Sequence, residues 1–204
     1  MGEPRSYRGV AFEQRREHRR EALLQTGLDC LQSDGLQGVS VRSICARAHL
    51  TPRYFYENFS DLDELLVAIV DAVAAEVAAR ALEAVAAAPD NLAAQVRAAV
   101  DAGYGVVADD RRKANALLVA AAGHGPLRDR RQEIVMQYAD LAMANLPVLG
   151  EMTAVDRRQA KATALFLMGG AAELIGAVLS GSLRLSRIRV VDRLTEFWVA
   201  VLSL

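Results

Sequence analysis

The stretch that decides the fold is residues 35–66, GLQGVSVRSICARAHLTPRYFYENFSDLDELL. Ser40 is a favourable N-cap for a short helix over 41–48, because its hydroxyl can accept from a free backbone N–H at the helix start. Thr51 can cap a second short helix with Pro52 at its first position, where a missing N–H costs nothing. Two short helices joined by so short a turn predict a helix-turn-helix.

The second of these helices, 52–58, is the one that a helix-turn-helix inserts into the major groove of DNA. The small residues Cys45 and Ala48 allow the two helices to cross closely, and Phe55 has the spacing of an apolar anchor. Arginine can donate two hydrogen bonds to guanine, and hydroxyl groups can hold phosphates. The predicted DNA contacts are the residues left on the outward face: Ser40, Arg42, Thr51, Pro52, Arg53, Tyr54, Tyr56 and Asn58.

Helical patterns continue through the rest of the chain. Ala, Leu, Glu and Arg, which favour helices, are abundant, whereas aromatic residues make up 5% of the sequence. Glycine, proline and capping residues divide the pattern, so we expect an all-α fold of nine helices. Their predicted ranges are 13–33, 41–48, 52–58, 61–88, 91–108, 111–122, 126–146, 156–180 and 186–202. We expect a DNA-binding domain over 1–60 and a second domain over 61–204.

Charge is distributed unevenly along the chain. The formal net charge of −1 gives no global sign of a polyanionic partner, so a DNA-binding surface depends on local charge. Six arginines lie between Arg5 and Arg20, opposed there by Glu13 and Glu17. We expect Arg5 and Arg8 to lie on an arm that contacts DNA ahead of the first helix. The alternative, from charge alone, is a solvated helix face preceded by a disordered tail.

Residues 20–66 resemble the DNA-binding domain of the TetR/AcrR transcriptional regulators. That family has a helix ending in Gly, a Ser or Thr cap, an Ile-Ala pair, a small turn, a short aromatic helix and a helix opening with acids and Leu. The matching positions are Gly35, Ser40, Ile44-Cys45, His49, Tyr56, Phe59 and Glu64-Leu65. The resemblance implies a nine-helix TetR-like fold, a homodimer, operator double-stranded DNA as partner and a small-molecule effector bound in the C-terminal domain.

Three positions depart from the family pattern. Cys45 stands where Ala is usual, and both side chains are small. His49 stands at the usual Gly of the turn, so we expect a positive φ there with some strain. Leu62 replaces a Lys that commonly touches a phosphate, which removes one ionic contact.

The last two helices, 156–180 and 186–202, are those that pair across the two-fold axis in the family. Small residues on the first allow close approach, and the second ends in an apolar stripe at helical spacing. The predicted interface residues are Gly169, Gly170, Leu174, Phe197 and Trp198. An intramolecular core is the alternative. The apolar run 163–180 approaches membrane-spanning length but contains Glu173, so we expect an interface helix and no membrane span.

A ligand pocket is expected among the helices between residues 61 and 180. Few polar residues there have apolar helical surroundings, and these are candidates to orient a ligand, with Met and Phe as adaptable walls. The candidates are Tyr104, His124, Met136, Tyr138, Phe166, Met168 and Glu173. Each has the alternative of a satisfied core group or an exposed residue. The abundance of Ala and Leu indicates an apolar ligand.

Other classes of function find little support. The sequence has no Gly-rich phosphate loop, HExxH or paired CxxC, and its three histidines form no recognisable set, so we expect no enzyme, no metal and no cofactor. Cys30 and Cys45 are expected as buried, reduced thiols, and the N-terminus has no signal-peptide pattern, which predicts a cytoplasmic protein. A helical protein that binds anionic membranes through its arginines is a further alternative. By analogy with the family, the favoured hypothesis is a repressor released by its ligand, the alternative a ligand-independent regulator or an activator.

Overall fold

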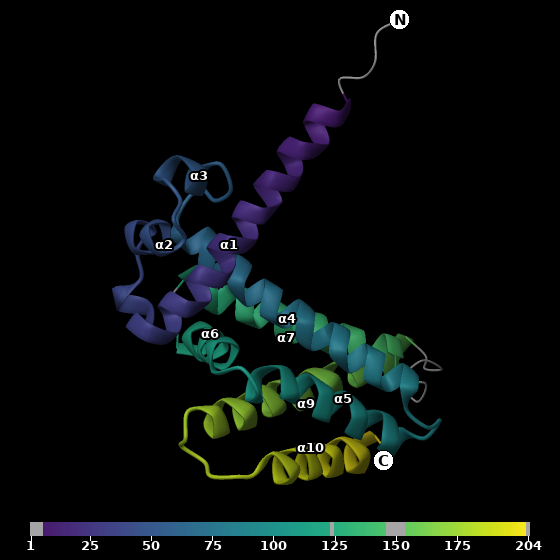
Figure 1. Cartoon of the computed structure of the whole chain (residues 1–204). Helices are drawn as coiled ribbons and strands as arrows, with labels where there is room; N and C mark the ends of the chain where they lie inside the picture. The colour runs from purple at the N-terminus through teal and green to yellow at the C-terminus, as the bar shows by residue number, and fades with distance from the viewer. Residues whose placement is uncertain (1–5, 123–124, 146–153, 203–204) are drawn as a thin grey trace, which may run out of the picture. The chain divides into compact units, whose positions relative to one another are not determined.

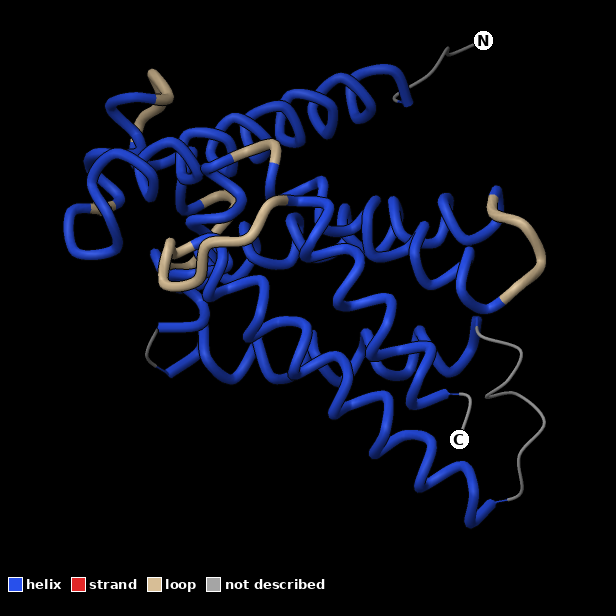
Figure 2. The backbone as a smooth tube through the Cα atoms, turned by 90° about the horizontal axis from the view of Figure 1, so that it is seen from below, coloured by secondary structure: helices blue, strands red, loops and turns tan. Residues whose placement is uncertain are grey.

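The computed structural model describes residues 6–122, 125–145 and 154–202. Within these ranges the chain forms nine helices and no strand, which confirms the all-α prediction (Figure 2). The helices form two compact units, Met1–Ile69 and Val70–Leu204. The division falls inside α4 (Leu62–Ala87), whereas the sequence analysis set the boundary after residue 60.

The first unit is built on α1 (Ser6–Gly38), which packs against α2 (Val41–Arg47) and α3 (Pro52–Tyr56) (Figure 1). A Cβ at Gly27 would lie 2.5 Å from Cδ1 of Ile69, so α1 and the start of α4 also approach closely. The buried core of this unit includes Leu23, Leu31, Ile44, Phe55, Phe59, Leu65 and Leu66. The two cysteines are free and buried, as expected, and burial raises the pKa of both thiols.

The first helix differs from its predicted range at both ends. It begins at Ser6 rather than at Glu13, because no proline after Pro4 interrupts the helical pattern. Arg8 therefore lies within the helix and not on an arm, while Arg5 lies outside the described residues. Gly35, with φ 63°, breaks the helix where the sequence analysis placed its end.

The second unit contains most of α4 and α5 (Leu92–Ala108), α6 (Arg111–Ala122), α7 (Gly125–Asn145), α9 (Ala154–Leu179) and α10 (Arg187–Leu202). The largest contacts pair α5 with α10 and α7 with α9 (Figure 1). Both pairs are antiparallel, because ion pairs join their residues in opposite order along the chain. These ion pairs are Arg131–Glu173 and Asp140–Lys161 between α7 and α9, and Arg97–Asp192 and Asp101–Arg187 between α5 and α10. One buried cluster of this unit consists of Val96, Ala160, Leu167 and Trp198.

Candidate functional site

The helix α2 begins with a reciprocal cap. The backbone N–H of Ser43 donates to Oγ of Ser40 over 3.1 Å, and the backbone N–H of Ser40 donates to Oγ of Ser43 over 3.0 Å. Such a capping box satisfies two N–H groups that the helix leaves free. The turn that follows contains His49 with φ 53°, which confirms the positive φ expected there. Thr51 occupies the N-cap position of α3, but its side chain makes no capping hydrogen bond, and the start of α3 relies on Pro52.

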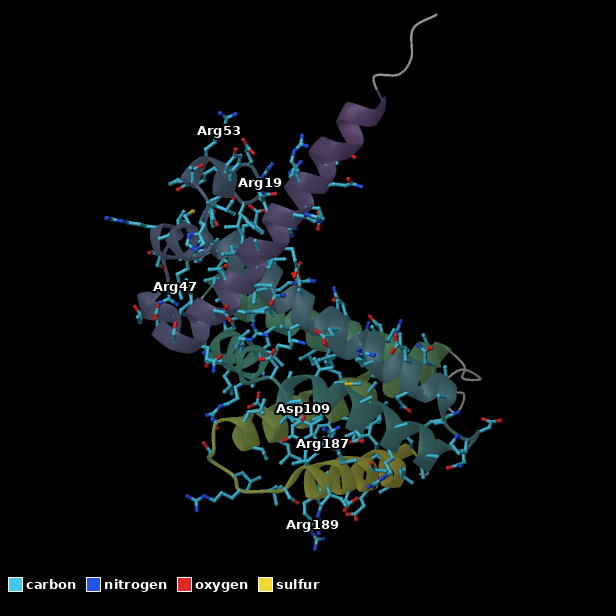
Figure 3. All side chains as sticks on the ribbon, in the orientation of Figure 1. Arg19, Arg47, Arg53, Asp109, Arg187 and Arg189 are labelled. Atoms are coloured by element: carbon cyan, nitrogen blue, oxygen red, sulfur yellow. The ribbon has the colours of Figure 1, made fainter. Side chains whose placement is uncertain are left out.

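The helix α3 is anchored by its aromatic residues on one side and exposed on the other. Phe55 and Phe59 are fully buried, and the guanidinium of Arg20 lies 4.5 Å above the ring of Phe59. The Arg53 side chain is 84% exposed and points away from the helix (Figure 3), and Tyr56 is exposed as well. The buried anchor fixes the orientation of α3, so its outward face presents a cation and a phenol to solvent.

A charged cluster connects α1 with α3. Glu57 accepts from Nε of Arg53 over 3.1 Å, and Nη2 of Arg19 lies 3.6 Å from the same carboxylate. The guanidinium of Arg19 also lies 4.5 Å above the ring of Tyr54. This cluster was not predicted from the sequence, although the four-residue spacing of Arg53 and Glu57 is a helical ion-pair signal. Arg19 thus stabilises the position of α3 from the side of α1.

A second ion pair ties α2 to the end of α1. Arg47 donates to both carboxylate oxygens of Asp34, over 2.8 and 3.0 Å, and to Oγ of Ser33 over 2.8 Å. The hydroxyl of Ser33 and the guanidinium of Arg47 together hold the pKa of Asp34 below its usual range. The two helix-turn-helix elements are therefore each linked to α1 by an arginine.

Most of the predicted DNA-contact residues are exposed, whereas two of them use their side chains in hydrogen bonds within the protein. Arg42, Thr51, Pro52, Arg53, Tyr54 and Tyr56 are exposed on α2, α3 and the turn. The Ser40 hydroxyl is used by the cap described above, although the residue itself is exposed. Asn58 is partly buried, and its Nδ2 donates to the carbonyl of Tyr54 over 2.8 Å, so this side chain ends α3 instead of facing outward.

The second unit contains a cavity of about 300 Å³ between α4, α5, α6, α7, α9 and α10. Its walls are mainly Val, Leu, Ile and Ala side chains. Four of the predicted ligand residues line it, namely Tyr104, Tyr138, Met168 and Glu173. A cavity of this size is at the small end of the range for ligand sites.

Polar contacts hold α4 against α6 and α7, beside this cavity. Nζ of Lys113 on α6 donates to Glu76 over 2.6 Å, and Nε of Arg130 on α7 donates to Asp71. The hydroxyl of Tyr138 donates to the carbonyl of Ala74 over 2.7 Å. Burial raises the pKa of Tyr138, which keeps its hydroxyl protonated as a donor.

One ion pair belongs to the cavity wall itself. Nη2 of Arg131 on α7 donates to Oε1 of Glu173 on α9, and both residues line the cavity. Glu173 was predicted as a ligand residue from the sequence, whereas Arg131 was not. Helical spacing could have found it, because Arg131, Val135 and Tyr138 lie on one face of α7.

Three predicted ligand residues are placed elsewhere. Met136 lies on another face of α7, beside Gln132 and Gln137, and does not line the cavity. Phe166 on α9 is 74% exposed and is not part of the wall. His124 lies outside the described residues.

The predicted interface residues also divide into two groups. An added Cβ at Gly169 or Gly170 meets no atom within 4 Å, and Phe197 is 55% exposed. Leu174 is partly buried, whereas Trp198 is buried in the core of its own chain and lines the cavity. The segment Arg158–Leu179 is long and apolar enough to cross a membrane, and 11% of its apolar window is buried.

Solved structures match this arrangement of helices, although no protein-family model and no curated protein matches the sequence. A transcriptional regulator from Pseudomonas aeruginosa PAO1 has a TM-score of 0.72 at 20% identity, covering 92% of this chain and 91% of its own. A TetR-family regulator from Syntrophomonas wolfei has a TM-score of 0.71 at 14% identity, covering 92% and 96%. The regulator FadR from Bacillus subtilis, in complex with stearoyl-CoA, has a TM-score of 0.68 at 13% identity, covering 86% and 95%. The chain therefore has the TetR-like fold that the sequence analysis predicted.

Proposed function

We propose that this protein is a transcriptional regulator of the TetR family that binds operator DNA through α2 and α3. The observation that carries the proposal is the outward face of α3, where Arg53 and Tyr56 are exposed on a helix anchored by Phe55. Arg42 at the start of α2 is exposed as well. An arginine and a phenol on a rigidly held recognition helix are suited to contact base edges and phosphates. The TetR-like fold supports the same assignment.

The proposal includes a homodimer through α9 and α10. Phe166 and Phe197 are large apolar side chains exposed on these helices. A Cβ added at Gly169 or Gly170 of α9 would meet no atom within 4 Å, so this side of the helix is open. Exposed apolar surface of this kind marks an interaction site in a soluble protein. A two-fold dimer buries the same face of both copies and presents two recognition helices to a pseudopalindromic operator.

The proposal assigns the cavity of the second unit to a small, largely apolar effector. Its walls are mainly aliphatic, and FadR, which has a similar fold, was solved with stearoyl-CoA. A repressor is released when the effector binds more tightly to a conformation that does not fit the operator. This function assigns no catalytic role to any side chain and places the protein in the cytoplasm with its DNA.

The test of DNA binding is fluorescence anisotropy of the protein on DNA from upstream of its own gene and on a shuffled duplex, across a salt series. We expect selective binding that weakens steeply with salt, and Arg53→Ala to cost at least tenfold in affinity. Tyr56→Phe removes one hydroxyl from the same face and is expected to cost less. The matched control is Arg80→Ala, an exposed arginine on α4 that pairs with Glu83.

Two results would contradict the proposal. One is equal affinity for both duplexes together with a genome-wide selection that recovers no preferred fragment. The other is a selective complex that Arg53→Ala and Tyr56→Phe weaken no more than Arg80→Ala does, because the recognition helix would then lie elsewhere.

A further inference from the structure

The apolar wall of the cavity extends along two long helices. The cavity is lined along α4 from Val70 to Val85 and along α7 from Arg131 to Asn145. At 1.5 Å per residue, these stretches are about 21 Å long. An apolar lining of this length is suited to an unbranched hydrocarbon chain.

The length of the cavity sets the length of such a chain. An extended chain of single bonds advances about 3.5 Å for every three bonds. A lining of about 21 Å therefore accommodates about 18 bonds, a chain of up to about 19 carbons. Shorter chains leave part of the apolar wall without a partner, which lowers their affinity.

The cavity wall contains two charged residues, Arg131 and Glu173. Arg131 begins the lining stretch of α7, and its guanidinium is paired with Glu173. The side chain of Glu173 is 75% exposed, whereas that of Arg131 is 31% exposed. The carboxylate of Glu173 can therefore turn into water at little cost, while the guanidinium stays beside the cavity. Tyr138, farther along α7, already donates its hydroxyl to Ala74.

We infer that the cavity binds an unbranched long-chain carboxylate whose head group takes the place of Glu173 on Arg131. The chain then lies along α4 and α7 toward Asn145. The guanidinium of an arginine can donate two parallel hydrogen bonds to a carboxylate, which gives the head group a fixed position. The inference names the effector class, and it rests on the proposed function only in treating the cavity as the effector site.

Trp198 provides the readout, because it lines the cavity and is the single tryptophan of the chain. Its fluorescence is recorded while the full-length protein, without DNA, is titrated with hexadecanoate, hexadecanol or octanoate. The same titrations are made with Arg131→Gln and Glu173→Gln. The matched control is Arg128→Gln, an exposed arginine on the same helix that does not line the cavity.

We expect hexadecanoate to bind at least tenfold more tightly than hexadecanol or octanoate. Arg131→Gln should remove most of the preference for the acid over the alcohol, whereas Arg128→Gln should keep it. Glu173→Gln should tighten hexadecanoate several-fold and leave hexadecanol unchanged, because the acid no longer competes with a protein carboxylate. If Arg131→Gln does not fold, the inference is still tested by the binding of acid and alcohol to the wild-type protein and by Glu173→Gln.

Equal binding of acid and alcohol, or a Glu173→Gln variant that binds hexadecanoate no more tightly, overturns the inference. So does an unchanged tryptophan signal with all three compounds. These titrations contain no DNA, so they fail independently of the proposed function. A protein that binds operator DNA but not hexadecanoate contradicts only the effector class, and one that binds the acid but no DNA contradicts only the regulator.

Discussion

The guanidinium of Arg187 at the start of α10 occupies the space that a side chain at Gly105 of α5 would need. A Cβ at Gly105 would lie 2.8 Å from Nη2 of Arg187. The guanidinium is held there by Asp101, which accepts from Nε over 2.9 Å, and by Asp109, which accepts from Nη1 over 3.0 Å (Figure 3). Glycine at position 105 inside α5 is therefore explained by the side chain of Arg187, which lies against the helix at this point.

This relationship predicts a coupling between the two positions. Alanine is favoured over glycine inside a helix by about 0.5–1 kcal/mol. In the wild-type protein we expect Gly105→Ala to be close to neutral, because it displaces Arg187 from its carboxylates. In an Arg187→Ala background we expect the same change to stabilise the protein by about 0.5–1 kcal/mol. Urea unfolding of the four proteins measures both effects, and equal effects of Gly105→Ala in the two backgrounds would contradict the coupling.

Tyr138→Phe should destabilise the second unit. The change removes the hydroxyl that donates to the carbonyl of Ala74 and leaves a partly buried acceptor without this partner. Because this carbonyl lies inside α4 and keeps its helical hydrogen bond, we expect a cost of about 0.5–1.5 kcal/mol. Thermal and urea unfolding measure it against Tyr54→Phe, which removes a hydroxyl from an exposed ring. The hydrogen bond contributes nothing to stability if the two variants unfold alike.

The carboxylate of Asp110 predicts a specific acid sensitivity. Hydrogen bonds from the side chain of Arg112, with further help from its backbone N–H, lower the pKa of Asp110 from 3.8 to about 2. A pKa that is lower in the folded chain stabilises it above pH 4, and this stabilisation is lost as the pH falls from about 4 to 2. Asp110→Asn, which can still cap α6, should therefore show a shallower loss of stability across that range.

The measurement is urea unfolding at several pH values between 2 and 5. Asp129→Asn on the exposed face of α7 is the matched control for the loss of one carboxylate. An Asp110→Asn protein whose stability falls as steeply as that of the wild type would show that this carboxylate does not titrate in the window.

Much of the fold follows from local signals in the sequence. Helix ends depend on capping residues, glycine and proline, so α6 was predicted to the residue and α5 to within one residue. Asn91 caps α5 by accepting from the backbone N–H of Ala94, and His49 takes a positive φ as its place in the turn predicts. Such features involve few neighbouring residues, and one sequence is sufficient to identify them.

The site residues are less predictable, because their roles depend on contacts between distant segments. Phe197 and Trp198 are neighbours on an apolar helix, yet one is exposed and the other is buried beside Val96. The sequence pattern gave no reason to separate them. Arg131 was missed for a similar reason, since its partner Glu173 lies 42 positions away. Pairings of this kind need the packing of α7 on α9.

Phe166→Glu should dissociate the proposed homodimer without unfolding the chain. The phenyl ring is largely exposed within one chain, so the substitution removes few internal contacts. In a two-fold interface it introduces two buried charges without partners, which is strongly destabilising. Sedimentation velocity is expected to show a dimer for the wild type and for Tyr56→Glu, an equally drastic change on α3. A Phe166→Glu protein that remains dimeric would place the interface elsewhere.

The cluster of Arg19, Arg53 and Glu57 predicts how charge controls DNA binding. The carboxylate of Glu57 pairs with Arg53 over 3.1 Å and lies 3.6 Å from Arg19, so it offsets positive charge beside the proposed recognition surface. Glu57→Gln removes this negative charge and frees Arg53. We expect the variant to bind a shuffled duplex several-fold more tightly at low salt, because the charge near the phosphates increases.

The gain should disappear at high salt, where charges are screened within a few ångströms. Selectivity for operator DNA should fall at the same time, since the added affinity does not depend on sequence. Glu83→Gln is the matched control, because Glu83 pairs with exposed Arg80 on α4 in the same manner. If Glu57→Gln instead weakens binding to both duplexes, Glu57 acts by positioning Arg53, and the ion pair is required for recognition rather than opposed to it.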